Sequence, residues 1–467
     1  MKRHDVVLYI FFIILILHGV LFADANETQE SDAYLKVARE ITDSVLVHGR
    51  AYEMLRELTS RIGARLVGSP SAAAAVTWAQ QKMMEYGLQN VHLQPVRVPY
   101  WYRGEVEKAE IINSETLGTY PLTICALGNS VGTPALGLVA PVLEVQNFDE
   151  LDSLAEKARG RIIFFNRAMD PRLLNTFAAY SRAVDQRVRG AARAAKVGAV
   201  AVLVRSVTTR QDDVPHTGVM VYDENLPRIP AAAISTVDAD LLSSLLQREK
   251  EVRVRLELDC RDYGSQMSAN VIGEITGEEL PEKVVLIGAH LDSWDKGQGA
   301  HDDGAGCVQA IEALRLLKAC GLRPRRTIRV VLFMGEETGI WGGRAYADSL
   351  RRDGPVHFAA IESDRGGFMP RGFTINAADS VVKRIARYAY LFSDMQATTF
   401  RRGGGGADIS PLQKVGTTTI GLLTEMQRYF DYHHSDNDTF DKVNERELSL
   451  GAAAMAILAY VLAMEGL

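Results

Sequence analysis

The chain has 467 residues, of which 47% are hydrophobic and 24% are charged, and its formal net charge is −6 at pH 7. This length allows two or three globular domains with a large core. The negative balance, and a sequence without a long basic run, exclude a general attraction to nucleic acid.

The first residues have the pattern of a secretory signal. The basic start MKRHD is followed by the apolar segment VVLYIFFIILILHGVLF and by Ala23-Asp24-Ala25, which has the small-x-small form of a cleavage site. An uncleaved anchor is the alternative, because the segment approaches the ~18 residues that suggest a membrane span. We expect residues 1–25 to be a signal peptide and the rest to be secreted or periplasmic, with no membrane contact after cleavage.

Residues 26–118 predict the first part of an α/β domain, and residues 119–261 differ from them. Apolar residues recur at helical spacing from 31 to about 86, and residues 91–100 alternate as a half-buried strand does. From 119 to 261, short strand-like runs such as APVLEV, GRIIFFN and AVAVLVRS alternate with turns. We predict a smaller, mostly-β domain inserted here, in which the isolated His216 has no function.

Four cysteines are too few for a disulfide scaffold. Cys125 and Cys260 flank the middle region and either pair there or remain free buried thiols. No cysteine spacing predicts a cysteine–zinc site.

Residues 262–467 contain the strongest α/β pattern. Continuous apolar runs predict strands buried on both faces at 284–289, 327–334, 356–362 and 417–423. Helical patterns lie around them at 304–319, 341–351, 379–393 and 446–465. Strands that alternate with helices predict a mainly parallel central sheet flanked by helices.

Acidic and histidine side chains directly follow these strands. His290 and Asp292 follow the first, Glu336 and Glu337 the second, Asp364 the third, and His434 comes in the loop after the fourth. Ligands of open α/β sheets bind beyond the carboxyl ends of the strands, so we expect these side chains to meet at one rim. Each residue alone is as consistent with a helix cap or a loop, and only the joint arrangement indicates a site.

Clustered carboxylates repel one another unless a cation lies among them. Mixed histidine and carboxylate ligands suit zinc, with cobalt or manganese as substitutes. Five or more ligands exceed what a single zinc ion with an open position needs. Two ions about 3.5–4 Å apart that share a carboxylate fit better, so the pattern favours a two-metal centre.

The motifs that carry these residues resemble those of a known family. GAHLDSWDKGQGAHDDGAG, FMGEETG, ESD and YHHSDNDT resemble the motifs of carboxypeptidase Q-like di-zinc peptidases, which are related to bacterial leucyl aminopeptidase. GRIIFFN, PHTG and IPAAAIS resemble the protease-associated domain inserted in that family. The resemblance implies a zinc-dependent exopeptidase fold, with a peptidase domain at 26–118 and 262–467 and a protease-associated insert at 119–261.

The resemblance also implies the metal ligands. Asp302 bridges two zinc ions, His290 and Asp364 complete one site, and Glu337 and His434 complete the other. His301 replaces a different residue of many relatives and either competes as a ligand or lines the pocket. His433 neighbours the assigned ligand, but the spacing of His434 to Asp438 fits the family pattern. A cis peptide bond after the bridging aspartate, Asp302-Asp303, is expected as well.

The implied reaction is peptide hydrolysis. Metal binding lowers the pKa of water from about 15.7 towards ~7. Glu336 acts as general base, takes the proton of the attacking water and passes it to the leaving amine. Asp292 is expected to accept a hydrogen bond from the His290 ring and so fix its tautomer.

The implied substrates are dipeptides or short peptides with free termini, and the implied assembly is a homodimer. The loop RRGGGGADIS (401–410) is a candidate to receive the far carboxylate through backbone N–H groups, Arg401 or Arg402. Asp408 in this loop has no assigned role. The alternatives are a broad aminopeptidase acting on longer peptides and a non-catalytic, transferrin-receptor-like binding protein. The presence of all the expected ligands and the base argues against the second.

Overall fold

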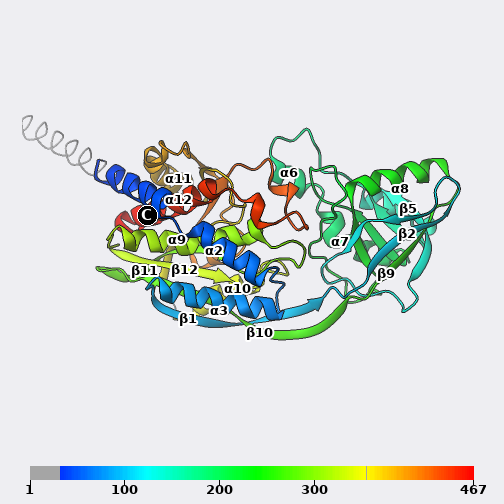
Figure 1. Ribbon diagram of the computed structural model, residues 1–467, viewed down its shortest axis with the longest axis horizontal. Coiled ribbons are helices and arrows are strands. Elements are labelled where there is room, and N and C mark those ends of the chain that lie inside the picture. The colour runs from blue at the N-terminus through cyan, green and yellow to red at the C-terminus, as the bar shows by residue number, and fades with distance from the viewer. Residues whose placement is uncertain (1–31, 354) are drawn as a thin grey trace, which may run out of the picture.

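The computed structural model describes residues 32–353 and 355–467. The predicted signal peptide therefore lies outside the described residues. Figure 1 shows two units at opposite ends of the molecule, linked by the long strands β1 (Gln89–Tyr102) and β10 (Arg261–Ile275). These two strands pair antiparallel, with Val96 opposite Ser268 and Trp101 opposite Asp262.

The first unit is built on an eight-stranded sheet in the order β1-β10-β12-β11-β13-β16-β14-β15. Its other strands are β11 (Leu280–His290), β12 (Arg326–Phe333), β13 (Val356–Glu362), β14 (Pro370–Asn376), β15 (Thr399–Arg402) and β16 (Thr418–Thr424). The central strands β12, β11, β13 and β16 pair in parallel. On either side of them, β10 pairs antiparallel with β12 and β14 pairs antiparallel with β16, so the sheet is mixed with a parallel centre.

Alternate residues of the central strands face two different cores. Val285 and Ile287 of β11 belong to the main core of this unit, whereas Leu286 belongs to a smaller core. The helices of this unit are residues 32–48, α2 (Ala51–Glu57), α3 (Pro70–Glu85), α9 (Ala305–Ala319), α10 (Trp341–Asp353), α11 (Asp379–Ala386) and α12 (Glu445–Glu465). Burial of both faces explains why these strands are continuous apolar runs.

Among the described helices, α12 is the one that is long enough and apolar enough to cross a membrane. In its most apolar stretch, 89% of the residues are buried inside the protein. It packs against α9 and α2 and against β11 and β12. Its apolar surface is therefore used by the core of the first unit.

The second unit has its own eight-stranded sheet, in the order β3-β2-β9-β5-β6-β7-β8-β4. Its strands are β2 (Glu107–Ser114), β3 (Gly118–Leu122), β4 (Ile124–Ala126), β5 (Leu138–Val145), β6 (Ile162–Phe165), β7 (Ala201–Arg205), β8 (Ala231–Ile234) and β9 (Arg253–Leu258). Its helices are α4 (Phe148–Ser153), α5 (Ala155–Ala158), α6 (Thr176–Ser181), α7 (Asp185–Lys196) and α8 (Thr236–Arg248). The sheet takes in β2, which precedes the predicted boundary at residue 119.

This second unit is α/β rather than mostly β. Leu242 and Leu245 of α8 pack into one core of the unit, and Ala191 and Ala194 of α7 pack into another. The middle strands β5, β6, β7 and β8 pair in parallel. The prediction emphasised the short strand-like runs and did not recognise the amphipathic pattern of α8.

The four cysteines are free thiols, and Cys125 and Cys260 do not pair. Burial raises the pKa of both of these thiols to about 12. They are therefore inert core residues of the second unit and its border.

Candidate metal centre

The predicted site residues come together at the carboxyl ends of the parallel strands. His290 is the last residue of β11, and the segment with Glu336 and Glu337 follows β12. Asp364 follows β13, and His434 lies in the loop after β16. Because β11 lies between β12 and β13, His290 is at the middle of this rim.

His290, Asp302 and Asp364 form the first ligand group. The Nε2 atom of His290 lies 3.3 Å from Oδ1 of Asp302 and 3.6 Å from Oδ1 of Asp364. The side chains of His290 and Asp302 are buried, whereas the side chain of Asp364 is 23% exposed to solvent. The group is therefore accessible to solvent on the side of Asp364.

Asp302, His433 and His434 form the second ligand group. The Nε2 atom of His434 lies 3.3 Å from Oδ2 of Asp302 and 2.9 Å from Oε2 of Glu337. The Nε2 atom of His433 is farther away, at 3.7 Å from Oδ2 of Asp302. The two imidazole rings stack with their centroids 3.5 Å apart, and His434 is the one in contact with Glu337.

Asp302 belongs to both groups and presents one carboxylate oxygen to each. Its peptide bond to Asp303 is cis. Two buried carboxylate oxygens, Oδ2 of Asp302 and Oε1 of Glu337, receive no hydrogen bond from the described residues. Such atoms are costly to bury unless a cation compensates them. The donor set therefore fits a pair of divalent metal ions.

Burial and the neighbouring carboxylates at this rim disfavour the ionised form of each acidic side chain. Burial, followed by the charge of Asp302, raises the pKa of Glu337 well above its usual range. Burial also raises the pKa of Asp364. For Glu336 burial is again the largest cause and Asp364 adds to it, against an opposing effect of His290, so that the pKa is raised to about 8. Divalent cations among these carboxylates would lower all three pKa values.

Asp292 contacts the His290 ring differently from what we expected. The Nδ1 atom of His290 lies 2.9 Å from the carbonyl oxygen of Asp292 but 3.8 Å from its carboxylate. The carboxylate instead accepts hydrogen bonds from the backbone N–H groups of Gly335, Glu336 and Glu337 at 2.6, 3.2 and 3.3 Å. Asp292 thus orients the histidine through its main chain and fixes the acidic loop through its side chain.

Two further buried carboxylates fix the chain around Asp302. Asp438 accepts hydrogen bonds from the backbone N–H groups of His301 and Asp302, at 2.7 and 3.1 Å. Asp303 accepts one from the N–H of His290 at 3.1 Å and one from the first turn of α9 at 3.0 Å. Sequence reasoning did not assign these roles, although both residues lie within the motifs that it used.

A buried arginine from the N-terminal segment supports the same loop. The guanidinium of Arg65 donates hydrogen bonds to the carbonyl oxygens of Gly63, Leu291, Gln298 and Gly299 at 2.8–2.9 Å. Arg65 is fully buried. Sequence reasoning missed it because all of these partners are backbone atoms, and a lone arginine after a helix belongs to no motif.

His301 lines the site and is not a ligand in this arrangement. Its ring lies nearly parallel to those of Phe368 and Tyr432, at centroid distances of 4.2 and 5.1 Å. Its Nδ1 accepts a hydrogen bond from the N–H of Gly367 at 3.2 Å, and its Nε2 lies 3.3 Å from the carbonyl oxygen of Lys442. Burial lowers the pKa of His301 to about 3, so the ring is neutral and both nitrogens have partners.

The second unit contacts the loop that carries the two adjacent histidines. The N–H of Thr217 donates to the carbonyl of His434 at 2.9 Å, and the carbonyl oxygen of Thr217 lies 3.3 Å from Nδ1 of His434. The Nδ1 atom of His216 lies 2.6 Å from the carbonyl oxygen of His433. His216 is therefore buried against this loop and is not the isolated residue that its sequence context indicated.

The glycine-rich loop 401–410 divides into two parts. Arg402 is exposed and lies 3.5 Å from Asp379 at the surface. Asp408 is fully buried, and neither of its carboxylate oxygens has a hydrogen-bond partner among the described residues. Burial, followed by the charge of Glu362, raises the pKa of Asp408 well above its usual range. Asp408 thus belongs to the interior near the rim, whereas Arg402 points to the surface.

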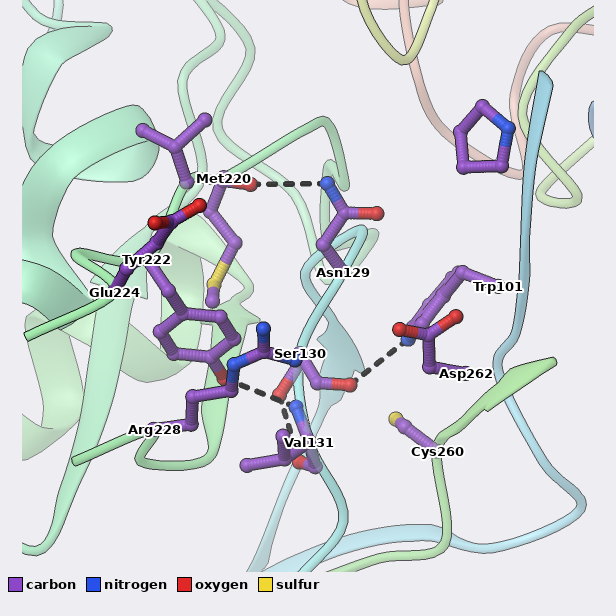
Figure 2. Close-up of a pocket in the computed structure, with 12 residues that line it drawn as sticks. Trp101, Asn129, Ser130, Val131, Met220, Tyr222, Glu224, Arg228, Cys260 and Asp262 are labelled. Atoms are coloured by element: carbon purple, nitrogen blue, oxygen red, sulfur yellow. Dashed lines mark hydrogen bonds between the residues drawn. The ribbon is translucent and has the colours of Figure 1, made fainter. Parts of the chain in front are cut away.

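A cavity of about 360 Å³ lies away from this centre, where the linker strands meet the second unit. Figure 2 shows Trp101 and Tyr222 on its walls, with Trp101 donating to the carbonyl of Ser130 at 2.8 Å. None of the predicted site residues lines it. The cavity is a feature of the junction between the units and not of the metal centre.

Known proteins resemble this chain over most of its length. Residues 270–461 match peptidase family M28. Carboxypeptidase Q of Bos taurus is 37% identical over 439 residues, which cover 93% of this chain and 90% of that protein. The crystal structure of a peptidase M28 precursor from Shewanella amazonensis matches with a TM-score of 0.89 at 36% identity, covering 94% of this chain and 98% of the other. The zinc aminopeptidase BSAP from Bacillus subtilis shares the fold, with a TM-score of 0.64 at 20% identity and coverage of 89% and 95%.

Proposed function

Because the chain belongs to peptidase family M28, and is therefore a metallopeptidase, we propose that it is a secreted exopeptidase of dipeptides or short peptides with free termini, working with two zinc ions. The observation that carries the proposal is the position of Asp302, whose two carboxylate oxygens face two separate ligand groups. The names of the relatives, which include a carboxypeptidase and aminopeptidases, support action at chain ends.

In this proposal each ion has its own ligands. His290 and Asp364 hold one ion, Glu337 and His434 hold the other, and Asp302 is shared. The zinc aminopeptidase of the same fold supports zinc as the metal, and the mixed histidine and carboxylate set suits it. Bound zinc would polarise the peptide carbonyl and lower the pKa of a water molecule to about 7.

Glu336 is the general base of the proposed reaction. Its backbone is fixed by Asp292, and it directly precedes the candidate ligand Glu337. The side chain of Glu336 is half-buried whereas that of Glu337 is buried, so Glu336 is the one that reaches the substrate side. It accepts a proton from the attacking water and returns it to the leaving amine.

The proposal is tested by combining metal quantification with a peptide panel on the purified protein. We expect about two zinc ions per chain and hydrolysis of dipeptides whose termini are free, with activity lost on chelation and restored by zinc. N-acetylated dipeptides and longer peptides form the comparison. Faster cleavage of longer peptides would favour a broad aminopeptidase, and a metal-loaded protein that cleaves no peptide would favour a binding protein.

A further inference from the structure

Arg365 is a cation beside the candidate metal centre whose guanidinium makes no hydrogen bond or ion pair within residues 32–353 and 355–467. It directly follows Asp364, and its side chain is half-buried. The guanidinium lies over the ring of Phe177 from α6, 5.4 Å from the ring centroid. Among the described residues, it has neither a hydrogen bond nor an ion pair. A half-buried positive charge is therefore left without a direct ion-pair partner among the described residues.

The main chain fixes where this side chain begins. The carbonyl oxygen of Arg365 accepts a hydrogen bond from Oγ1 of Thr424, the last residue of β16, at 2.8 Å. The next residue, Gly366, has a φ of +75°, and a Cβ there would lie 2.7 Å from the ring of Phe368. Because the turn admits only glycine at this point, Arg365 is held between the end of β13 and the second unit.

The surroundings of the guanidinium favour an anion. Arg401 is close enough to add positive charge, and Asp364 and Glu362 are nearby acidic groups. Asp364 is the adjacent carboxylate, but it lies 3.6 Å from His290 and is assigned to a metal ion. Phe177 stacks on Tyr429 with the ring centroids 5.2 Å apart, and this stack supports the guanidinium from the side of the second unit. An arginine on an aromatic ring, beside a second arginine, is well suited to bind a carboxylate.

We propose that Arg365 binds the free C-terminal carboxylate of the substrate, with Arg401 adding to the positive potential. This assignment rests on the proposed exopeptidase function and explains how a free carboxyl terminus would be recognised. In a dipeptide, the carboxylate lies within one residue, about 3.8 Å between Cα atoms, of the bond to be cleaved. Its binding partner must therefore lie next to the ligands, which is where Arg365 is placed in the chain.

Arg402 is a matched control for this role. It is the last residue of β15 and directly follows Arg401, but it is exposed and paired with Asp379. Replacing Arg402 by methionine removes the same charge at a place that the proposed carboxylate does not reach.

The test compares a dipeptide with the C-terminal amide of the same dipeptide. For Arg365→Met we expect the KM of the free acid to rise roughly 10- to 100-fold, because a charge-assisted, two-point contact is lost. The KM of the amide should change less than about twofold, because the amide never made that contact. Metal content should equal that of the unaltered protein, Arg365→Lys should recover part of the affinity, and Arg402→Met should affect neither substrate.

A third substrate identifies which carboxylate is bound. A dipeptide amide with glutamate in the second position carries a side-chain carboxylate and no terminal one. Arg365→Met should leave its KM unchanged. An equal rise for acid and amide, or a rise only for the glutamate amide, would overturn the proposal. Failure of the exopeptidase function would look different, because the unaltered protein would then cleave neither acid nor amide.

Discussion

Glu336 and Glu337 are adjacent and chemically identical, but their surroundings give them different tasks. Glu337 is buried and lies 2.9 Å from His434, whereas Glu336 is half-buried. We expect Glu336→Gln to retain both metal ions and to lose activity by roughly 10²- to 10⁴-fold in kcat, because the amide cannot accept a proton. Metal quantification and kinetics on the same preparation test this.

Glu337→Gln is the contrasting variant, because it weakens a ligand and should lower the metal content instead. Normal turnover by Glu336→Gln would show that the base is another residue. A loss of metal by Glu336→Gln would place that residue among the ligands.

At the residue scale, the sequence predicted side chains that belong to motifs and missed those that act through the backbone. His290, Asp302 and Asp364 could be predicted because polar residues after buried strands of a parallel sheet must meet at one edge. Arg65 could not, since its partners are four carbonyl oxygens and any sequence supplies those. Asp292 was placed at the site, but only the structure shows which of its atoms contacts the His290 ring.

At the scale of elements, β13 connects the metal centre to a buried histidine at its opposite end. His357 has its Nε2 2.8 Å from the hydroxyl of Tyr346 in α10 and its Nδ1 2.9 Å from the carbonyl oxygen of Pro355. Burial lowers the pKa of His357 to about 4 from 6.5. The unfolded chain therefore binds a proton at higher pH than the folded one, so this part of the stability is full above about pH 6.5 and is lost as the pH falls towards 4.

We expect this histidine to account for about 2 kcal/mol of the stability lost between pH 7 and pH 5. Urea unfolding of the unaltered protein and of His357→Gln at the two pH values measures it. Glutamine remains neutral, so the variant should lose less stability on acidification. Identical losses in the two proteins would mean that His357 is protonated in the folded state as easily as in the unfolded one.

The strands that could be predicted best from the sequence are those that are buried on both faces. β11 and β12 are buried on both faces, and their apolar runs could be recognised directly. β10 could not, because its first half is exposed where it links the units and only its second half pairs with β12 as well as β1. β15 is a short strand at the edge of the sheet and is mostly exposed, so burial on both faces does not mark its pattern.

At the scale of the whole molecule, Arg103 at the end of β1 joins the second unit to the loop of the metal centre. Its side chain is only 7% exposed to solvent. The guanidinium forms an ion pair with Asp295 and lies 3.0 Å from the carboxylate of Glu107. We expect Asp295→Ala to destabilise the protein by about 3 kcal/mol, because a buried guanidinium loses its partner while Glu107 compensates in part. Chemical denaturation measures the free energy of unfolding.

The exposed pair of Arg39 and Asp394 provides the control. Asp394→Ala should leave the free energy of unfolding nearly unchanged, because exposed ion pairs contribute little. If Asp295→Ala were equally harmless, the contact between the units would not depend on Arg103.

The packing of the two units against each other was beyond prediction from the sequence. Thr217 and His434 are in contact although they are 217 residues apart in the chain. The aromatic cluster in which Tyr180 of α6 stacks on Phe430 joins the same distant segments. Neither segment contains a periodic pattern that indicates which other segment it contacts. Only the folded chain therefore shows that the second unit packs against the loop with His433 and His434.

The position of His434, 217 residues after Thr217 in the chain, has a consequence for the timing of biosynthesis. A ribosome completes the segment that contains Thr217 before it reaches the histidine loop, so the residues that receive this loop are made first. A polypeptide released before residue 434 lacks one of the proposed ligands. On this assignment, a growing chain cannot hydrolyse peptides before residue 434 has been added.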